Sequence, residues 1–202
     1  MPAGRYAVFG DDVERIGTEE FRCAPGPLGW RYFSDIQTNE PTPHVETFDV
    51  VVDAEWRPVR LRVDTGEHHV LLEPRGDVLG GGRDGVPIEL PWAPDRHLDY
   101  LTPATNLITT KRLTHTAEID VLVLEPVTLE PTLVSQRYQR KANESVDTAV
   151  GRFDATRWTY TSLDSGWTSD LWVAGDIVVR YDRLFELEWY EAGASGPQPT
   201  TV

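Results

Sequence analysis

The sequence has a single cysteine and no long hydrophobic run, and both shortages narrow what the protein can be. Cys23 cannot form an internal disulfide, so we expect a small buried side chain and a reducing compartment. The longest apolar runs, residues 50–52 and 121–124, are far shorter than the about 20 residues of a membrane-spanning helix. The N-terminal stretch MPAGRYAVFGDDVE lacks the apolar core of a secretory signal. We therefore predict a cytoplasmic protein that does not insert into membranes.

Basic residues are scarce relative to acidic ones. The chain has 19 Lys and Arg against 33 Asp and Glu, which gives a net charge of −14. The negative electrostatic field of such a chain repels the phosphates of nucleic acids and the headgroups of anionic membranes. We expect no nucleic-acid partner and interpret the acidity as a contribution to solubility.

Motifs that identify common cofactor or nucleophile sites are missing. The glycine-rich stretch GGGRDG, residues 80–85, lacks the Lys-Ser/Thr pair of a phosphate-binding loop, and we interpret it as a wide turn. No G-x-S-x-G elbow is present. The pair His68-His69 and the later His97 follow no metal-binding spacing. We predict no cofactor and no metal.

What the sequence does contain is a succession of short segments in which apolar and polar residues alternate. The predicted strands are 14–22, 29–38, 45–53, 59–64, 68–73, 86–90, 118–124, 132–140, 153–161, 167–174 and 177–190. Turn-forming residues separate them at short spacing, so neighbours should pair antiparallel in hairpins. The length suits a single domain over residues 1–191, followed by a disordered tail over 192–202.

The last predicted strand is the longest and indicates the overall shape. Long strands curve, and one curved sheet of long strands tends to wrap into a barrel or half-barrel. The predicted fold class is therefore all-β and mainly antiparallel, with a single curved sheet wrapped into a lipocalin-like barrel or half-barrel. One short helix, near residues 102–113, is expected to plug or cover it.

The stretch HLDYLTPATNLITTKRL, residues 97–113, carries that helix. Thr102 is a suitable N-cap and Pro103 suits the first helical position. Apolar residues then recur at helical spacing, with Leu107 and Ile108 facing inward. The polar residues placed at the rim of the barrel are His97, Asp99, Tyr100 and Asn106.

Two further groups of residues indicate a cavity. Trp30 with Tyr32, and Trp158 with Tyr160, share strand faces, and aromatic side chains line ligand pockets as well as fill cores. Arg157 and Arg183 fall on apolar strand faces. Each therefore either pairs with a carboxylate, which we favour, or meets an anionic ligand. A bulge between residues 175 and 190 would remove the argument for Arg183. The predicted ligand-binding residues are Trp30, Tyr32, Asn106, Arg157, Trp158, Tyr160 and Arg183.

Two segments carry a resemblance in layout to known proteins. YAVFGDDVERIGTEEF, residues 6–21, and GRFDATRWTYTSLDSGWTSDLWVAGDIVVRYD, residues 151–182, resemble parts of bacterial lipoprotein carriers and of β-roll proteins thought to bind glycolipids. The resemblance implies a long antiparallel sheet around a hydrophobic cavity, with a short helix as lid or plug. Because no export signal is present, it does not imply a role as an envelope lipoprotein carrier.

Three functions from different classes are compatible with these patterns. The first prediction is a protein, monomeric or homodimeric, that binds a small hydrophobic or aromatic molecule in the barrel. The alternative is a cofactor-free lyase, isomerase or cyclase in which His97 pairs with Asp99 and Tyr100 is a second proton donor. The third is a structural or partner-binding domain. A smooth apolar cavity would favour the first, a polar ring facing a dry cavity the second, and a filled core the third.

Overall fold

The computed structural model describes residues 1–10, 12–40, 42–194 and 196–200, and its strands form one fifteen-stranded sheet. The strands are β1 Ala3–Phe9, β2 Arg15–Gly26, β3 Gly29–Thr38, β4 His44–Asp53, β5 Pro58–Asp64, β6 His69–Arg75, β7 Val78–Arg83, β8 Val86–Pro91, β9 His97–Asp99, β10 Ala117–Leu124, β11 Pro131–Thr148, β12 Gly151–Ser162, β13 Thr168–Ala174, β14 Ile177–Tyr181 and β15 Phe185–Glu191. Every neighbouring pair is antiparallel except β9 with β10. The predicted all-β, mainly antiparallel fold class is confirmed.

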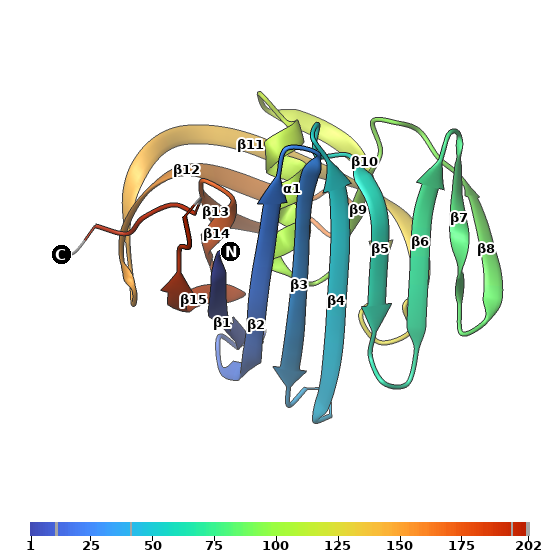
Figure 1. Cartoon of the computed structure of the whole chain (residues 1–202), viewed down its shortest axis with the longest axis horizontal. Coiled ribbons are helices and arrows are strands. Elements are labelled where there is room, and N and C mark those ends of the chain that lie inside the picture. The colour runs from blue at the N-terminus through green and yellow to red at the C-terminus, as the bar shows by residue number, and fades with distance from the viewer. Residues whose placement is uncertain (11, 41, 195, 201–202) are drawn as a thin grey trace.

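The sheet bends until its two halves face each other, and the helix α1 (Pro103–Arg112) lies between them (Figure 1). Strands β1 to β8 form one wall, and the long strands β11 and β12 arch over the opposite side. The strand order runs from β8 through β1 and β15 to β9, and β8 and β9 are its two edges. The barrel-like sheet is therefore curved but not closed, as the sequence predicted.

Alternation of buried and exposed side chains builds the wall formed by β1 to β3. The buried aromatic rings on its inner face stack in a continuous row, from Tyr6 to Phe21 (4.9 Å between ring centroids), to Tyr32 (5.4 Å) and to Trp30 (5.5 Å). Large rings stacked at this spacing gain packing energy beyond their buried area. The row therefore belongs to the core of the wall.

Three strands lie outside the sequence prediction: β1, β7 and β9. Strand β7 contains Gly80, Gly81 and Gly82, which we had interpreted as part of a wide turn. A Cβ at Gly81 would overlap the carbonyl oxygen of Leu71 on the neighbouring strand, so this glycine allows two backbones to approach closely. The actual turn follows at Asp84-Gly85, where both residues have positive φ.

The predicted strand 177–190 is wrong, because it is two strands joined by a tight turn. Tyr181 at the end of β14 pairs with Phe185 at the start of β15, and Arg183 between them has φ of 64°. The chain reverses there, so the alternation does not run through Arg183. This residue is exposed and donates a hydrogen bond to the carbonyl of Thr168 (2.9 Å).

The predicted helix over 102–113 is present as α1. Thr102 is its N-cap, with an extended backbone and a side chain that accepts from the N–H of Ala104, and Pro103 occupies the first turn. Side chains from Pro103 to Thr110 are buried, including three threonines. The helix is therefore a plug within the sheet. It is too short and too polar to cross a membrane, and it is the only helix among the described residues.

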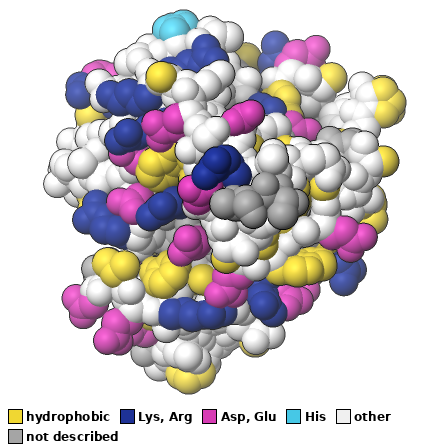
Figure 2. Space-filling view, turned by 90° about the vertical axis from the view of Figure 1, so that its left-hand side faces the viewer, with side chains coloured by type: hydrophobic (Ala, Val, Ile, Leu, Met, Phe, Trp, Pro, Cys, Tyr) yellow, Lys and Arg dark blue, Asp and Glu magenta, His cyan; other side chains and the backbone are white. Residues whose placement is uncertain are grey.

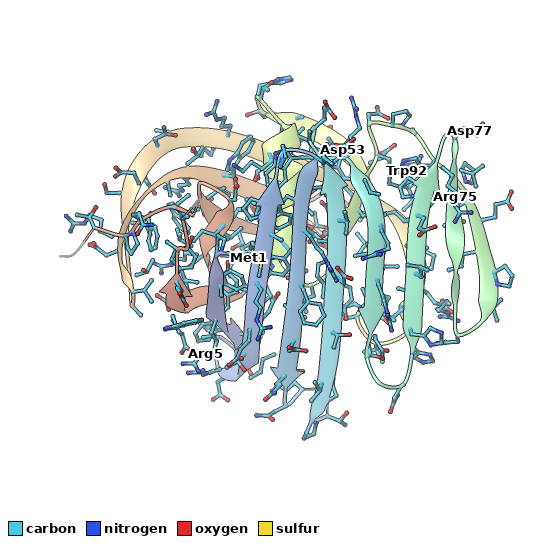
Figure 3. The ribbon with its side chains drawn as sticks, in the orientation of Figure 1. Met1, Arg5, Asp53, Arg75, Asp77 and Trp92 are labelled. Atoms are coloured by element: carbon cyan, nitrogen blue, oxygen red, sulfur yellow. The ribbon has the colours of Figure 1, made fainter. Side chains whose placement is uncertain are left out.

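The segment between β8 and β9 and the C-terminal tail lie against the sheet in part. Trp92, just past β8, donates its backbone N–H to the carbonyl of Asp77 (2.7 Å), and the two residues lie at the same end of the β7–β8 hairpin (Figure 3). In the tail, Thr200 exchanges two backbone hydrogen bonds with Arg152 of β12. A single domain over 1–191 and disorder over 192–202 remain predictions.

One face of the molecule carries charges of both signs. In this view, acidic and basic side chains alternate over the face without a broad patch of one sign (Figure 2). Ion pairs of the protein surface include Arg15 with Glu188 (2.6 Å) and Arg152 with Asp147 (2.7 Å). Exposed pairs of this kind add little stability, and they favour solubility over binding.

Candidate ligand-binding cavity

The segment that leads into α1 is held to the β1–β8 wall by two hydroxyl groups. Tyr100 donates to Oε2 of Glu46 on β4 (2.5 Å), and Thr102 donates to Oε1 of Glu19 on β2 (2.6 Å). Both carboxylates are buried. Buried polar groups need such partners, so these contacts define where the segment lies.

The same segment is held to the opposite wall by strand β11. Asp99 accepts hydrogen bonds from Nε2 of Gln136 (2.8 Å) and from the hydroxyl of Thr105 (2.7 Å). The side-chain oxygen of Asn106 accepts from the hydroxyl of Tyr138 (2.8 Å). Residues 99–106 therefore cross the space enclosed by the curved sheet and are hydrogen-bonded to both of its walls.

Two neighbouring cavities, which we call the two lobes of one site because they share lining residues, lie at the N-terminal end of α1, at the end of the barrel where the β1–β2 and β3–β4 turns are found. The tyrosine lobe has a volume of about 170 Å³ and the histidine lobe about 140 Å³. Both are lined mainly by apolar atoms. The residues that line both lobes are Tyr100, Leu101, Pro126, Leu184 and Phe185.

The tyrosine lobe combines aromatic rings with one carboxylate. Tyr160, Trp167 and Tyr181 line it together with Asp99. The hydroxyls of Tyr160 and Tyr181 have no hydrogen-bond partner among the described residues, although Tyr181 is only 4% exposed. Burial raises the pKa of Asp99, while the hydrogen bonds from Thr105 and Gln136 act in the opposite direction. The lobe thus offers two free hydroxyls and a carboxylate in an apolar setting.

The histidine lobe contains a different arrangement, an ion pair. The ring of His44 faces an acceptor at each nitrogen: the carbonyl of Thr42 at Nδ1 (2.6 Å) and Oε1 of Glu46 at Nε2 (2.8 Å). The hydrogen bond to Thr42, with that to Glu46, raises the pKa of His44. A ring that donates from both nitrogens is an imidazolium. When His44 is protonated, the charge of Glu46 is therefore balanced within the protein.

Glu19 lies behind the cavity, beneath the helix N-cap, and is fully buried. Its Oε1 accepts from Thr102 and from the hydroxyl of Tyr32 (2.7 Å), whereas its Oε2 has no partner among the described residues. Burial raises the pKa of Glu19 to about 7, and the nearby charge of Glu46 adds to the rise. Because Glu19 does not line either lobe, we assign it to the support of the helix.

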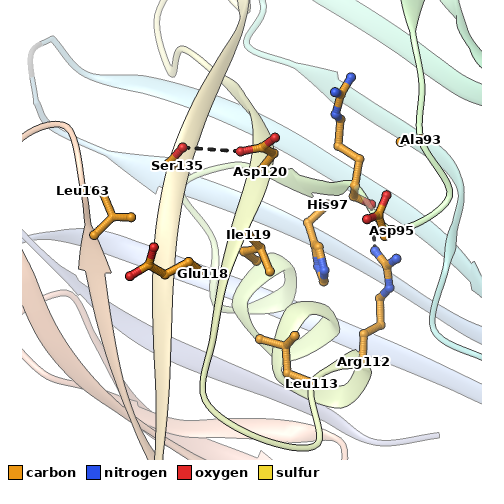
Figure 4. A pocket seen from close by; sticks show the side chains of 11 residues that line it. Ala93, Asp95, His97, Arg112, Leu113, Glu118, Ile119, Asp120, Ser135 and Leu163 are labelled. Carbon is orange, nitrogen blue, oxygen red and sulfur yellow. Dashed lines mark hydrogen bonds between the residues drawn. The ribbon is translucent and has the colours of Figure 1, made fainter.

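His97 lies apart from this cavity, which corrects the prediction that it pairs with Asp99. Its Nδ1 lies 3.1 Å from the hydroxyl of Thr109, one helical turn beyond the Thr105 that binds Asp99. The ring borders an open groove of about 630 Å³, lined also by Arg112, Glu118 and Ser135 (Figure 4). Burial lowers the pKa of His97 to about 3, and the charge of Arg112 adds to this. A ring that stays neutral and is hydrogen-bonded to Thr109 instead of Asp99 does not form an acid–base pair with Asp99.

The other predicted site residues are mostly elsewhere. Asp99, Tyr100, Asn106 and Tyr160 do line one lobe together. Trp30 and Tyr32 belong to the stacked row of the wall, and Trp158 lies beside Arg140 near the C-terminal end of α1. Of the four aromatic residues predicted to line one cavity, only Tyr160 lines the tyrosine lobe. The prediction that they lie together is therefore wrong.

The two arginines predicted on apolar faces do not enter the cavity. Arg157 is partly exposed, forms an ion pair with Asp170, and lies over the ring of Trp172 (5.6 Å to the centroid). An internal pair was the favoured interpretation, and the contacts agree with it. Arg183 occupies the turn described above. Neither is placed to meet a ligand in the barrel.

Sequence reasoning missed several residues that shape the cavity, namely Tyr181, Trp167, Glu46, His44, Leu184 and Phe185. The signal for Tyr181 was present as an aromatic residue on the inner face of its strand. The His44–Glu46 pair has i,i+2 spacing on β4, which places both side chains on one face. Among the described residues, no three His, Cys, Asp or Glu side chains form a group that could hold a metal.

Comparison with known proteins identifies structures of similar fold. No protein-family model matches the chain, and no curated protein matches it. A DUF1089 family protein from Pseudomonas aeruginosa is 21% identical, with a TM-score of 0.62 over 83% of this chain and 91% of that one. A beta-barrel-like protein of domain of unknown function DUF1849 from Brucella abortus is 10% identical, with a TM-score of 0.54 over 94% and 96% of the two chains. At these identities the likeness shows a curved, barrel-like fold alone.

Proposed function

We propose that this protein binds a small, largely apolar molecule in the two-lobed cavity at the N-terminal end of α1. The observation that carries the proposal is the tyrosine lobe, where an apolar lining surrounds Asp99 and two tyrosine hydroxyls without protein partners among the described residues. Ligand sites are typically concave and apolar, with a few polar groups that orient the ligand. A filled core would have left neither a cavity nor free hydroxyls at this position.

The size of the cavity limits the ligand. Lobes of about 170 and 140 Å³ together reach only the lower end of the range for drug-sized ligands, about 300–1,000 Å³. This favours a compact molecule over the long acyl chains of lipoproteins or glycolipids, so we do not extend the resemblance in layout to those ligands. Cys23 is buried and free, which fits a reducing compartment, and a cytoplasmic location is part of this proposal.

The proposal can be tested by filling the cavity. Leu184 borders both lobes, so Leu184→Trp should occupy the space and reduce the affinity for a small aromatic alcohol such as 2-phenylethanol at least tenfold, measured by calorimetry. Leu163→Trp is the matched control, because Leu163 lines the separate groove beside His97. Equal affinities for the wild-type protein and the Leu184→Trp variant, with both folded, would contradict the proposal.

A cofactor-free enzyme in the same cavity is the second candidate, and one observation favours it. Asp99 is a carboxylate whose pKa is raised by burial, as a general base in an apolar site requires. Because His97 is elsewhere, such a reaction would depend on Asp99 and a tyrosine. Recovery of a bound small molecule unchanged after long incubation with the protein would support the binding function over this one.

A further inference from the structure

Three carboxylates line the two lobes, and Glu40 is exposed to solvent. Of the two that are shielded from water, Asp99 differs from Glu46 because no cationic side chain in the described part of the protein pairs with it. Oε1 of Glu46 lies 2.8 Å from Nε2 of the His44 ring, whose pKa is raised. Asp99 receives side-chain hydrogen bonds only from Thr105 and Gln136, which are neutral, and no Lys, Arg or His side chain among the described residues lies within 4.0 Å of it. Asp99 is half-buried, and a carboxylate that loses hydration without gaining a counter-ion is costly, so the site favours a ligand that brings a positive charge.

The walls around Asp99 suit a cation as well. The rings of Tyr160, Trp167 and Tyr181 lie 5.6 to 6.4 Å from one another, centroid to centroid, with interplanar angles of 54° to 67°. Rings at these distances pack against one another, so together they form one aromatic wall of the lobe. Aromatic faces attract ammonium groups, and clusters of aromatic rings are a recurring way to bind them. The hydroxyl oxygens of the two tyrosines can also accept N–H groups.

We infer that the ligand of this cavity is a small primary amine, bound as its ammonium form with the nitrogen at Asp99 and its apolar body among the aromatic and aliphatic side chains. This inference rests on the proposed binding function and specifies the class of ligand. The net charge of −14 acts in the same direction, because a negative protein raises the local concentration of cations. A carboxylate ligand would instead face repulsion from Asp99.

The experiment compares two probes of equal size, 2-phenylethylamine and 2-phenylethanol, with a slightly longer carboxylate, 3-phenylpropanoate. Calorimetry at pH 7.5 should give an amine affinity about 10 to 100-fold higher than that of the alcohol, the usual range for a hydrogen bond to a charged group, and no measurable binding of the carboxylate. Asp99→Asn should lower the amine affinity toward that of the alcohol and change the alcohol affinity much less, because the amide oxygen can still accept from a hydroxyl group. Asp120→Asn, in the separate groove, is the matched control.

A second variant guards against misfolding of Asp99→Asn. Trp167 is 37% exposed, so its replacement by leucine should preserve the fold while reducing the amine affinity more than the alcohol affinity. Equal binding of amine and alcohol by the wild-type protein would overturn the amine inference and leave the proposed function standing. Failure of all three probes to bind would overturn both. Preferential binding of 3-phenylpropanoate would show that Asp99 does not set the selectivity.

Discussion

At the scale of single residues, the carboxyl group of Glu19 is the most constrained ionisable group under the helix. Its pKa is raised from 4.5 to about 7 in the folded protein, chiefly by burial. The folded state therefore holds the proton more tightly than the unfolded state. By linkage, the stabilising contribution of Glu19 is fully present below pH 4.5 and is lost as the pH rises through 7.

Glu19→Gln should remove this pH dependence. The amide keeps an oxygen that can accept from Thr102 and Tyr32, and it carries no charge to bury. A rise in pKa from 4.5 to about 7 corresponds to about 3 kcal/mol, so the variant should be more stable than the wild type at pH 8 by about 1–3 kcal/mol. Urea unfolding of both proteins at pH 4.5 and pH 8 measures the difference.

Glu20→Gln is the control for this prediction, because Glu20 is the exposed neighbour on the same strand. It should change stability by less than about 0.5 kcal/mol at either pH. The wild-type protein and the Glu19→Gln variant could instead change in stability by the same amount between pH 4.5 and pH 8. That result would mean that ionisation of Glu19 does not lower the free energy of unfolding, and it would contradict the prediction.

His97 should remain neutral across the physiological range. Burial holds its pKa at about 3, whereas the hydrogen bond to Thr42 raises the pKa of His44 above 6.5. We expect the ring resonances of His97, followed by nuclear magnetic resonance, to stay constant from pH 8 to pH 5 while those of His44 shift. His97→Gln would identify the signals. A midpoint for His97 near its ordinary value of 6.5 would mean that its ring is open to water.

Residue patterns predicted the cavity only in part. The capped helix identified Asp99, Tyr100 and Asn106 as residues of its lead-in and first turn, and all three line the tyrosine lobe. Alternation also placed Trp30 on the inner face of β3, but it cannot tell whether a ring on that face meets empty space or another ring. This depends on residues distant in the chain, such as Trp56, which packs 5.2 Å from Trp30.

At the scale of elements, the N-cap of α1 joins local helix stability to the interior. Thr102 accepts from the N–H of Ala104 and donates to Glu19, so one side chain serves both the helix and the wall. Thr102→Ala should lower the free energy of unfolding by about 2–3 kcal/mol, because it removes a cap and a hydrogen bond to a buried carboxyl group. Chemical unfolding with urea measures the loss.

Thr102→Ser tests the physical reason for that loss. Serine retains the hydroxyl and should restore stability to within about 1 kcal/mol of the wild type. If the serine variant were as unstable as the alanine variant, the methyl group and its packing, rather than the hydrogen bonds, would be responsible.

The strands that the sequence predicted well are those bounded by recognisable turn residues. Strand β3 was predicted with its observed bounds, between Pro27 and Asn39. The turn between β14 and β15 went unrecognised because Asp182-Arg183-Leu184 contains neither glycine nor proline, and Arg183 adopts positive φ without them. The pairing of Tyr181 with Phe185 determines the backbone conformation of Arg183, and the local sequence does not indicate it.

At the scale of the whole molecule, the plug explains how a sheet that does not close remains a stable shell. Asp99 and Asn106 bind β11, while Tyr100 and Thr102 bind β4 and β2. The segment thus joins walls that are separated by many strands in the sheet order. The sequence indicated a curved sheet with an internal helix, but these cross-connections depend on where each strand lies in space.

An open sheet must protect its edges, and β8 is the longer of the two. Pro87 and Pro91 lie two positions either side of Glu89, so the backbone nitrogens of these three residues point in one direction. Proline lacks an N–H and is tolerated where a strand does not donate to a partner, which places this direction away from β7. The edge therefore offers one outward donor, on a charged residue, and resists pairing with another sheet.

Replacing both prolines should expose this edge to association. Pro87→Thr combined with Pro91→Thr adds two outward N–H groups, so we expect a concentration-dependent dimer or larger species in sedimentation velocity, where the wild type stays in one state. Val86→Thr is the control, because Val86 already has its N–H and lies on the side that pairs with β7. A double variant that sediments like the wild type at every concentration would show that the prolines do not limit association, and that the short length and twist of β8 suffice.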